Sequence, residues 1–434
     1  MMRTLVTMLV GLLLLYLTPG GLCQGCAVNE AEHPLVRDLQ KKMIYSVDAS
    51  APPNPSILLS LRLAQDHNMH IEQDMLNKLS QDAVQRAVVS FSSGQVALHI
   101  LAQQASCSDP RRVSANSSTI NLVHLLEQKF QAELQNIAIH GNPLTNFYQL
   151  SLDVLALCQL NGRLSPANAS ALLSPDHKKY YLGGQFSVDT AAVAVLAQIC
   201  LQTRGQPLPP KVHKKIRQNV QWLVDKILAK KRRDGVIGNI YSTGLAMQAL
   251  SVSSSYLKPG AWNCLQTLHR VLDEIPQGTF KNPMAASQIL PSLENRTYLD
   301  VSRLNCSMNP DNLPLSTARP APPTSCCPPS ISVTYTVADS LNNTFNNSIS
   351  VTVPQGSVFF KVMEVAQDKD PSKFSFTYTQ SSWGPYITSV QGLQADNNQR
   401  TYWQLLSNGI PLSQGAGDYV VSNSERLEVK FSVY

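Results

Sequence analysis

The chain has 434 residues, of which 43% are hydrophobic and 15% are charged, and a formal net charge of +6. This length allows two or three domains, and the hydrophobic fraction is enough for buried cores. The small positive charge is not the footprint of a nucleic-acid-binding protein, and the densest basic run, residues 230–233, stands before Asp234 and Gly235 as at a solvated helix end.

The N-terminus has the pattern of a secretory signal peptide. Arg3 precedes an apolar run over residues 5–17, and small residues follow it up to Gly21. The run is too short for a membrane span, and no later segment approaches the roughly 18 apolar residues that a span requires. We therefore predict a signal peptide over residues 1–23 and a soluble, secreted, extracellular mature protein.

Nine cysteines are present, and removing Cys23 with the signal peptide leaves an even number that suits disulfides in an oxidising compartment. No Cys/His spacing in the mature chain matches a zinc site, so we predict disulfides and no metal site. N-x-S/T sequons predict N-linked glycans at surface positions. The sequon asparagines are Asn116, Asn168, Asn295, Asn305, Asn342 and Asn346.

An apolar segment rich in small residues recurs six times, at intervals of 40 to 54 residues. Each interval holds two helices and two loops, which is typical of a helical repeat. The copies are apolar nearly all round and are predicted to be buried inner helices, whereas residues 212–227 carry the single apolar stripe of an outer helix. Six such pairs can close into a toroid, and an open solenoid is the alternative on the pattern alone. The copies start at Pro55, Gly94, Tyr148, Val188, Ser242 and Pro283.

The composition changes near residue 308. Residues 308–330 are rich in proline, which is typical of an extended linker. Beyond them the hydrophobic period becomes two, over 331–337, 349–353 and 427–433, while residues 358–366 are predicted to form one helix. This pattern indicates a small domain with mostly antiparallel strands.

The predicted fold class is mainly α, a double-layered α6/α6 helical barrel followed by a small C-terminal α+β domain. The predicted divisions are the signal peptide at 1–23, the barrel domain at 24–307, the linker at 308–330 and the C-terminal cap domain at 331–434.

The sequence contains no GxSxG elbow, HExxH pair, Walker loop or GxGxxG, and no catalytic residue is predicted. Helical toroids can host glycoside hydrolysis, which needs two carboxylates flanking the sugar bond. Asp153 and Asp189 alone fall near the ends of the inner helices, and Asp153 lies in a buried-looking segment. A secreted α/α-barrel glycoside hydrolase is the alternative from another class, and a protein-binding interaction module is a third hypothesis.

Neutral polar side chains stand at the starts of the predicted inner helices, which in a toroid point to one mouth of the central cavity. Amide and hydroxyl groups there suit a large ligand edged with amides. Helix capping competes with this interpretation for Thr190 and Ser242, whereas Gln95, Gln149 and Gln288 cap poorly and favour a ligand or inter-helix role. The residues are Gln95, Thr145, Tyr148, Gln149, Asp189, Thr190, Asn239, Tyr241, Ser242 and Gln288.

Two aromatic segments, residues 382–386 and 402–406, are candidate binding faces of the C-terminal domain. Core packing is the alternative for each of them. Two domains joined by a linker, each with a candidate face, suggest a ligand held between them.

Ordered segments along the mature chain resemble the vertebrate cobalamin-binding transport proteins, the family of haptocorrin, intrinsic factor and transcobalamin. SWGPYITSVQGL and NNQRTYWQLLSNGIPLSQGAGDYVV are most similar to the haptocorrin branch, and GNIYSTGLAMQALSV is closer to intrinsic factor. The other segments are PNPSILLSLRLA, TNFYQLSLDVLALC, FSVDTAAVAVLA, NPMAASQILPSL and TYLDV.

The resemblance implies a non-catalytic carrier, a twelve-helix toroid with a small C-terminal domain, that binds cobalamin and related corrinoids tightly between the two for transport and protection. It implies a monomer without nucleic-acid or membrane partners, and a cell-surface uptake receptor as a candidate partner. An intrinsic-factor-like protein would instead deliver cobalamin to an intestinal receptor. The implied disulfides are Cys26–Cys264, Cys107–Cys306 and Cys158–Cys200, while Cys326 and Cys327 have no counterpart.

Carried over residue by residue, the resemblance implies cobalamin contacts in both domains. It implies no cobalt ligand from the protein, because Phe186 stands where transcobalamin has a cobalt-ligating histidine. The helical contacts are Gln95, Thr145, Asn146, Phe147, Tyr148, Gln149, Asp189, Asn239, Ser242 and Gln288. The C-terminal contacts are Trp383, Gly384, Pro385, Tyr386, Tyr402, Trp403, Gln404 and Leu405.

Overall fold

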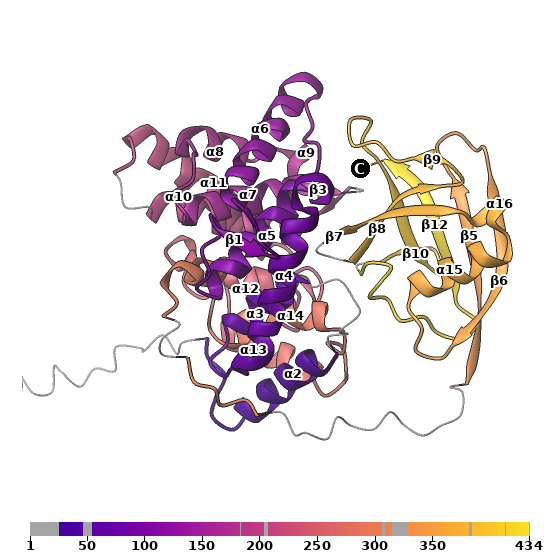
Figure 1. The fold of residues 1–434 in the computed structure, drawn as a ribbon, viewed down its shortest axis with the longest axis horizontal. Coiled ribbons are helices and arrows are strands. Elements are labelled where there is room, and N and C mark those ends of the chain that lie inside the picture. Colours follow the sequence, from indigo (N-terminus) through magenta and orange to yellow (C-terminus); the bar gives the residue numbers. More distant parts are fainter. Residues whose placement is uncertain are drawn as a thin grey trace, which may run out of the picture.

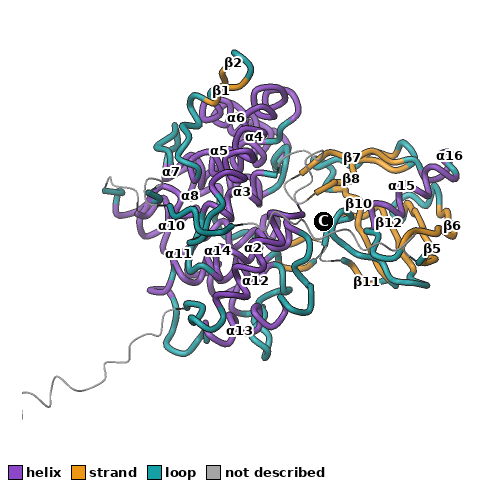
Figure 2. Tube along the Cα trace, turned by 60° about the horizontal axis from the view of Figure 1, so that its bottom comes forward, coloured by secondary structure: helices purple, strands orange, loops and turns teal. Residues whose placement is uncertain are grey.

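The computed structural model describes residues 26–46, 54–182, 184–203, 207–305, 309–314, 329–381, 384–412 and 414–433. Most of its helices lie in one part of the molecule and most of its strands in another (Figures 1 and 2). The predicted signal peptide, Cys306, Cys326, Cys327 and Trp383 lie outside the described residues. Across the residues that are described, no helix combines the length and the apolar character needed to cross a membrane.

Six inner helices form a closed ring in the described part of the chain. Each packs against the next, and the last one, α14, packs against the first, α3. This closure confirms the predicted toroid and excludes the open solenoid. The inner helices are α3 (Pro55–Arg62), α5 (Ser93–Ala105), α7 (Phe147–Gln159), α10 (Val188–Thr203), α12 (Ser242–Val252) and α14 (Pro283–Leu293).

The inner helices form because their sequences suit burial on all sides. In α10, every residue from Ala191 to Leu201 is buried, and small alanines alternate with larger apolar residues. A helix that is apolar all round is stable only when other helices surround it. The recurrent segment of the sequence therefore coincides with the wall of the ring.

The outer helices alternate with the inner ones and bury one face each. In α11, Ile216, Val220, Leu223 and Ile227 are buried at helical spacing, as predicted. The alternation sets the inner helix N-termini at one end of the ring, which we call the mouth. The outer helices are α2 (His33–Ser46), α4 (Met69–Ser90), α6 (Leu122–His140), α8 (Pro166–Leu172), α11 (Pro210–Leu228) and α13 (Cys264–Glu274), and the short α9 (His177–Tyr180) follows α8.

Protein fills the end of the ring opposite the mouth. The 3₁₀-helix η2 (Tyr298–Arg303) packs there against α5 and α10, and Tyr298 is buried. The Tyr298 N–H donates to Gln248 Oε1 at 3.0 Å, and Gln159 Nε2 donates to the Tyr298 carbonyl at 2.7 Å. Since Gln159 is the last residue of α7, these bonds hold η2 at the far end.

Short elements connect the ring helices. They are the hairpin β1 (Val113–Ala115) and β2 (Ser118–Ile120), the pair β3 (Tyr181–Leu182) and β4 (Gln185–Phe186), and the 3₁₀-helix η1 (Ser254–Tyr256).

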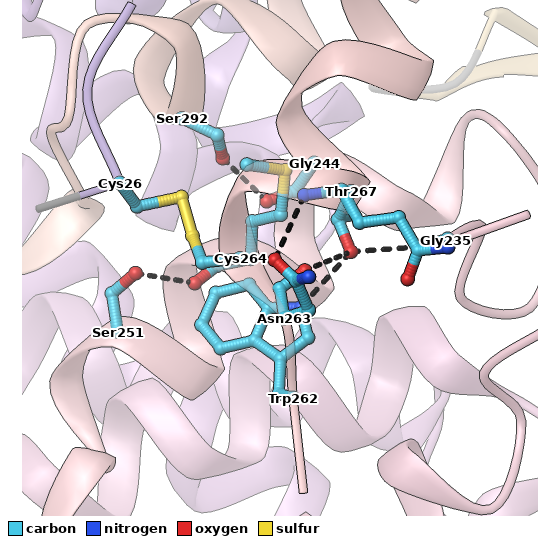
Figure 3. The surroundings of a disulfide bond; sticks show 11 residues. Cys26, Gly235, Gly244, Ser251, Trp262, Asn263, Cys264, Thr267 and Ser292 are labelled. Atoms are coloured by element: carbon cyan, nitrogen blue, oxygen red, sulfur yellow. Dashed lines mark hydrogen bonds between the residues drawn. A yellow bond between two sulfur atoms is a disulfide. The ribbon is translucent and has the colours of Figure 1, made fainter. Parts of the chain in front are cut away.

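Two disulfides fasten the ring within the described residues. Cys26 is joined to Cys264, which ties the first described residue to α13 (Figure 3). Cys158 is joined to Cys200, which links the neighbouring helices α7 and α10 with a Cα–Cα distance of 6.2 Å. Both are pairings that the resemblance implies. Cys107 is disulfide-bonded as well, to a partner beyond the described residues.

Residues 309–314, the first part of the predicted linker, are packed against the ring. Leu313 is fully buried in the helical core, and its N–H donates to the His67 carbonyl at 2.9 Å. Asn68 Nδ2 donates to the Leu313 carbonyl at 3.0 Å, and Asp311 Oδ1 accepts from the Met69 N–H at 3.0 Å. The chain thus stays anchored to the α3–α4 loop beyond the last ring helix.

The C-terminal part has its own core around a five-stranded sheet, with the strand order β11-β10-β12-β5-β6. Only the β12–β5 pairing is parallel among these described strands, so the predicted mostly antiparallel α+β fold is confirmed. The strands are β5 (Ser330–Asp339), β6 (Asn346–Pro354), β10 (Thr401–Ser407), β11 (Ile410–Pro411) and β12 (Arg426–Val433).

A helix and a second small sheet complete the C-terminal part. Helix α15 (Phe359–Lys369) buries Phe359, Val362 and Met363 in the C-terminal core. The short α16 (Pro371–Phe374) follows it. The second sheet has the order β7-β8-β9, with β7 (Phe376–Ser381), β8 (Gly384–Val390) and β9 (Leu393–Gln394).

Candidate ligand-binding site at the mouth of the ring

The C-terminal part meets the ring at the end of α6 and the start of α7. Asn136 Nδ2 donates to Asn398 Oδ1 at 2.8 Å, and Asn397 Nδ2 donates to the Leu144 carbonyl at 2.5 Å. Asn142 Nδ2 reaches the Asn398 carbonyl at 3.4 Å. All these bonds come from the turn that precedes β10.

A second contact joins the C-terminal part to the start of α14. Asn282, the N-cap of α14, donates its amide to the Asp418 carboxylate. Gly384 lies beside Met284, because a Cβ added at this glycine would come within 4.0 Å of Met284 Cε. In the ring order, α7 and α14 are three positions apart and therefore face each other. The C-terminal part consequently contacts the mouth on two opposite sides, and Figure 1 shows it beside the ring.

Amide side chains at the mouth hold the helix starts. Asn146 Oδ1 accepts from the Gln149 N–H at 2.9 Å, and Asn239 Oδ1 accepts from the N–H groups of Tyr241 and Ser242 at 2.9 and 2.8 Å. Gln149 Oε1 in turn accepts from the Gly94 N–H of the neighbouring inner helix at 3.3 Å. This last bond is the inter-helix role that was one of the two expected for Gln149.

For Gln95 the expectation of poor capping is wrong. Gln95 Oε1 accepts from the Ser92 N–H at 2.9 Å, while Ser92 Oγ accepts from the Gln95 N–H, which is a capping box. A glutamine three residues after the N-cap is long enough to reach back to it, so residue type alone does not predict its capping ability.

These hydrogen bonds determine which donor groups remain available at the mouth. The carbonyl ends of Asn239 and Gln149 accept from backbone N–H groups, so the other end of each amide is an NH₂ donor. The N-termini of the inner helices add further backbone donors. This side of the site therefore suits ligand groups that accept hydrogen bonds, such as amide carbonyls.

Asp189 supplies an acceptor among these donors. Ser242 Oγ donates to Asp189 Oδ2 at 2.8 Å, while Oδ1 is buried and has no hydrogen-bond partner in the described structure. Burial raises the pKa of Asp189 to about 6. Gln288 Oε1 is likewise buried without a partner. Both oxygens are therefore available as acceptors at the mouth.

Glu133 of α6, which is not among the predicted site residues, orients Thr145. Glu133 is 2% exposed and accepts from Thr145 Oγ1 at 2.7 Å, from the Thr145 N–H at 3.1 Å and from Ser93 Oγ at 3.0 Å. The Thr145 hydroxyl proton is thus committed to Glu133, and its oxygen is left as an acceptor. An acidic residue three positions after buried Phe130 was the available signal.

Asp153 does not form an accessible carboxylate pair with Asp189. It is fully buried, and burial followed by the nearby Glu133 charge raises its pKa well above the usual range. A carboxyl inside the ring wall cannot flank a sugar bond, so the geometry gives no support to the hydrolase alternative.

The candidate contact residues of β10 lie on two opposite faces of the sheet, because side chains alternate along a strand. Trp403 is 4% exposed, and its ring centroid lies 4.9 Å from that of Phe431, within the C-terminal core that Leu405 also contacts. Core packing, the alternative left open above, therefore describes these two residues. Tyr402 and Gln404 point to the opposite face of the sheet.

Other predicted contact residues lie near the mouth with more exposure. Tyr386 is 42% exposed, and Pro385 packs beside Gly417. Tyr148 is half-buried, and Lys179 Nζ lies 5.7 Å from the Phe147 ring centroid.

Phe186 is buried in an aromatic cluster. Its ring centroid lies 5.4 Å from that of Tyr181 and 6.3 Å from that of Trp222. Phenylalanine has no lone pair for a metal. In the described residues, no three His, Cys, Asp or Glu side chains group closely enough to hold a metal ion.

Comparisons with known proteins assign this chain to a family. The family described as "Eukaryotic cobalamin-binding protein" matches residues 8–326, and a domain of unknown function matches residues 356–433. Human transcobalamin-1 is 45% identical over 98% of this chain and 98% of its own length, and human cobalamin binding intrinsic factor is 36% identical over 97% and 98%.

Among solved structures, haptocorrin in complex with Cbi is 42% identical, covers 95% of this chain and all of its own chain, and superposes with a TM-score of 0.78. The matched family covers most of the sequence, and the ring and C-terminal part match the solved relative together. The chain therefore belongs to the eukaryotic cobalamin-binding protein family.

Proposed function

We propose that this chain is a secreted carrier that holds cobalamin at the mouth of the helical ring, beneath the C-terminal part. Cobalamin is the ligand supported by the family and by the solved relative in complex with Cbi. The observation that carries the placement is the span of the C-terminal part across a mouth lined with amides and with unpaired buried oxygens.

The polar groups of the mouth fit the edge of a corrin ring, which carries amide side chains. Asn239 and Gln149 offer NH₂ donors to ligand carbonyls. Asp189 Oδ1, Gln288 Oε1 and the Thr145 oxygen offer acceptors to ligand NH₂ groups. A ligand amide has both ends, so a site that provides donors and acceptors can pair both.

No side chain at position 186 reaches the cobalt in this proposal, since Phe186 packs against Trp222. The upper axial ligand is then water or the group that the cobalamin brings. The role of the chain is capture rather than catalysis, in keeping with relatives that are cobalamin-binding proteins.

Secretion, glycosylation and the domain limits belong to the proposal. We infer a signal peptide over residues 1–23, domains over 24–307 and 331–434, a monomeric mature protein and a Cys107–Cys306 bridge. The sequon asparagines are all exposed, which supports glycan attachment. They are Asn116, Asn168, Asn295, Asn305, Asn342 and Asn346.

The test is titration of the purified full chain with cyanocobalamin, followed by its visible spectrum. We expect one equivalent to bind, and Gln288→Ala to weaken binding while an exposed variant, Gln131→Ala, leaves it unchanged. A chain that takes up no cyanocobalamin would contradict the proposal.

Competition with a corrinoid of altered lower base then separates a haptocorrin-like carrier, which accepts this corrinoid, from an intrinsic-factor-like carrier, which rejects it.

A further inference from the structure

A second polar surface lies at the start of α11, on the end of the ring away from the mouth. A depression of about 430 Å³ opens there to solvent. Figure 1 shows α11 on the side of the ring opposite the C-terminal part. The depression is lined by His213, Lys214, Arg217, Gln218, Gln221 and Tyr256.

The charge of this surface is positive and uncompensated. Lys211, Lys214, Lys215 and Arg217 are exposed, and none of them takes part in the ion pairs of the described residues. The neighbouring acids are few. Asp225 accepts from Gln221 Nε2 at 3.1 Å, and Asp176 lies beside α9.

Lys215 also acts electrostatically on Lys179 of α9, which lies towards the mouth beside Phe147. Burial, and to a lesser extent the charge of Lys215, lower the pKa of Lys179, while Asp176 acts in the opposite direction. Cations at a helix N-terminus also oppose the helix dipole, and the first turn of α11 contains no acid. Helix stability thus gives no reason for this clustering.

Hydrogen bonds hold the floor of the depression in place. Tyr256 OH donates to Gln202 Oε1 at 2.8 Å, and Gln202 Nε2 lies 3.3 Å from His213 Nε2. Gln221 Nε2 donates to the Tyr256 carbonyl at 3.2 Å. The polar side chains around Lys214 and Arg217 are consequently positioned before any ligand arrives.

We propose that this basic depression binds a linear sulfated polysaccharide. Lys214 and Arg217 stand one helical turn apart and pair with sulfate groups, since guanidinium and ammonium groups bind such anions by charge-assisted hydrogen bonds. The amides of Gln218 and Gln221 and the Tyr256 phenol suit sugar hydroxyls. The depression accepts one sugar unit, and the flanking lysines extend the contact along the polymer.

An anionic membrane fits this surface less well. Membrane-surface binding combines basic residues with apolar side chains that insert between lipids. The large hydrophobic side chains that are exposed in the described residues belong to other elements, for example Val89 of α4 and Ile139 of α6.

The experiment measures binding of the full chain to a heparin oligosaccharide at physiological salt. We expect the double variant Lys214→Ala/Arg217→Ala to bind about tenfold more weakly. The matched control, Lys230→Ala/Arg233→Ala, removes the same charge from the other basic run and is expected to change the affinity little. Cyanocobalamin uptake reports that both variants are folded.

Three results would overturn the proposal. The wild-type chain could fail to bind the oligosaccharide, the two double variants could weaken binding equally, or desulfated heparin could compete as well as heparin. Binding to phosphatidylserine vesicles that heparin does not displace, and that the Lys214/Arg217 variant abolishes, would assign the surface to a membrane instead. Because cobalamin uptake is measured separately, failure here leaves the carrier function untouched.

Discussion

Several side chains at the mouth hold the backbone with one end and leave the other end for a ligand. Asn239 holds the start of α12 through its oxygen, and Gln149 links α7 to α5 in the same way. The sequence indicated these residues as polar groups at helix starts. Glu133 carried a weaker signal, an acidic residue close after buried Phe130, and its role could not be predicted because Thr145 and Ser93 come from two other segments.

We expect Glu133→Ala to destabilise the ligand-free protein by about 1–3 kcal/mol, because it leaves the hydroxyls of buried Ser93 and half-buried Thr145 without their acceptor. Urea unfolding followed by circular dichroism measures this. Gln131→Ala, on the exposed face of the same helix, is the control and is expected to stay within about 0.5 kcal/mol of wild type. Equal midpoints for the two variants would contradict the assignment.

The buried carboxyl of Asp189 gives a stability effect that depends on pH. Its pKa is raised to about 6 in the folded protein, so folding disfavours the charged form above that pH. The native state binds the extra proton as pH falls through 6, and stability from this group rises between about pH 7 and pH 4.

We therefore expect Asp189→Asn to melt at a higher temperature than wild type at pH 7.5, with the difference shrinking towards pH 4. Ser242 can still donate to the asparagine oxygen. Thermal melts of the ligand-free protein across this range measure the effect. A difference in melting temperature between variant and wild type that stays the same at all pH values would show that the Asp189 carboxylate does not destabilise the fold.

At the scale of elements, the recurrence of small apolar residues located all six inner helices of the described ring, because a wall helix must be apolar on every side. Strand alternation located β5, β6 and β12 for a similar reason. The packing of η2 at the end of the ring opposite the mouth was not predicted, since a short 3₁₀-helix has no hydrophobic period long enough to recognise.

Helices α12 and α14 approach each other at Gly244. A Cβ added there would come within 2.2 Å of the Gln288 carbonyl oxygen, which belongs to the backbone and cannot move aside alone. We expect Gly244→Ala to push α14 outward, to destabilise the protein by about 1–3 kcal/mol and to weaken cobalamin binding through Gln288. Thermal melts and cyanocobalamin titration measure both effects.

Ser251→Ala, later in the same helix and exposed, serves as the comparison for Gly244→Ala. A Gly244→Ala protein with wild-type stability and affinity would mean that the two helices separate at no cost.

At the scale of the whole molecule, the order of the two parts was predictable from the change in hydrophobic period. Their contacts were not, because Asn136, Asn282 and Asn398 are polar residues in turns and at helix ends, where no pattern distinguishes a contact from a solvated side chain. The packing of Leu313 was hidden for a related reason, since it lies in a segment whose prolines suggest a linker.

The contacts across the mouth predict a kinetic effect. We expect Asn397→Ala/Asn398→Ala to speed cobalamin dissociation while leaving association nearly unchanged, because the variant loosens the closed form rather than the first encounter. A chase with excess unlabelled ligand measures dissociation. Asn77→Ala, on the outer helix α4, controls for loss of a surface amide. Unchanged dissociation in the double variant would contradict a closing role for this turn.

The anchoring of residues 309–314 on the α3–α4 loop determines how far a lifted cap could travel. Between Leu313 and Ser330 stand 16 residues, a length of chain that can span at most about 50–60 Å. A cap that swings open is thereby confined to a small volume around its own ring, at a local concentration on the order of millimolar. Such a cap would meet its own ring far more often than the ring of another molecule.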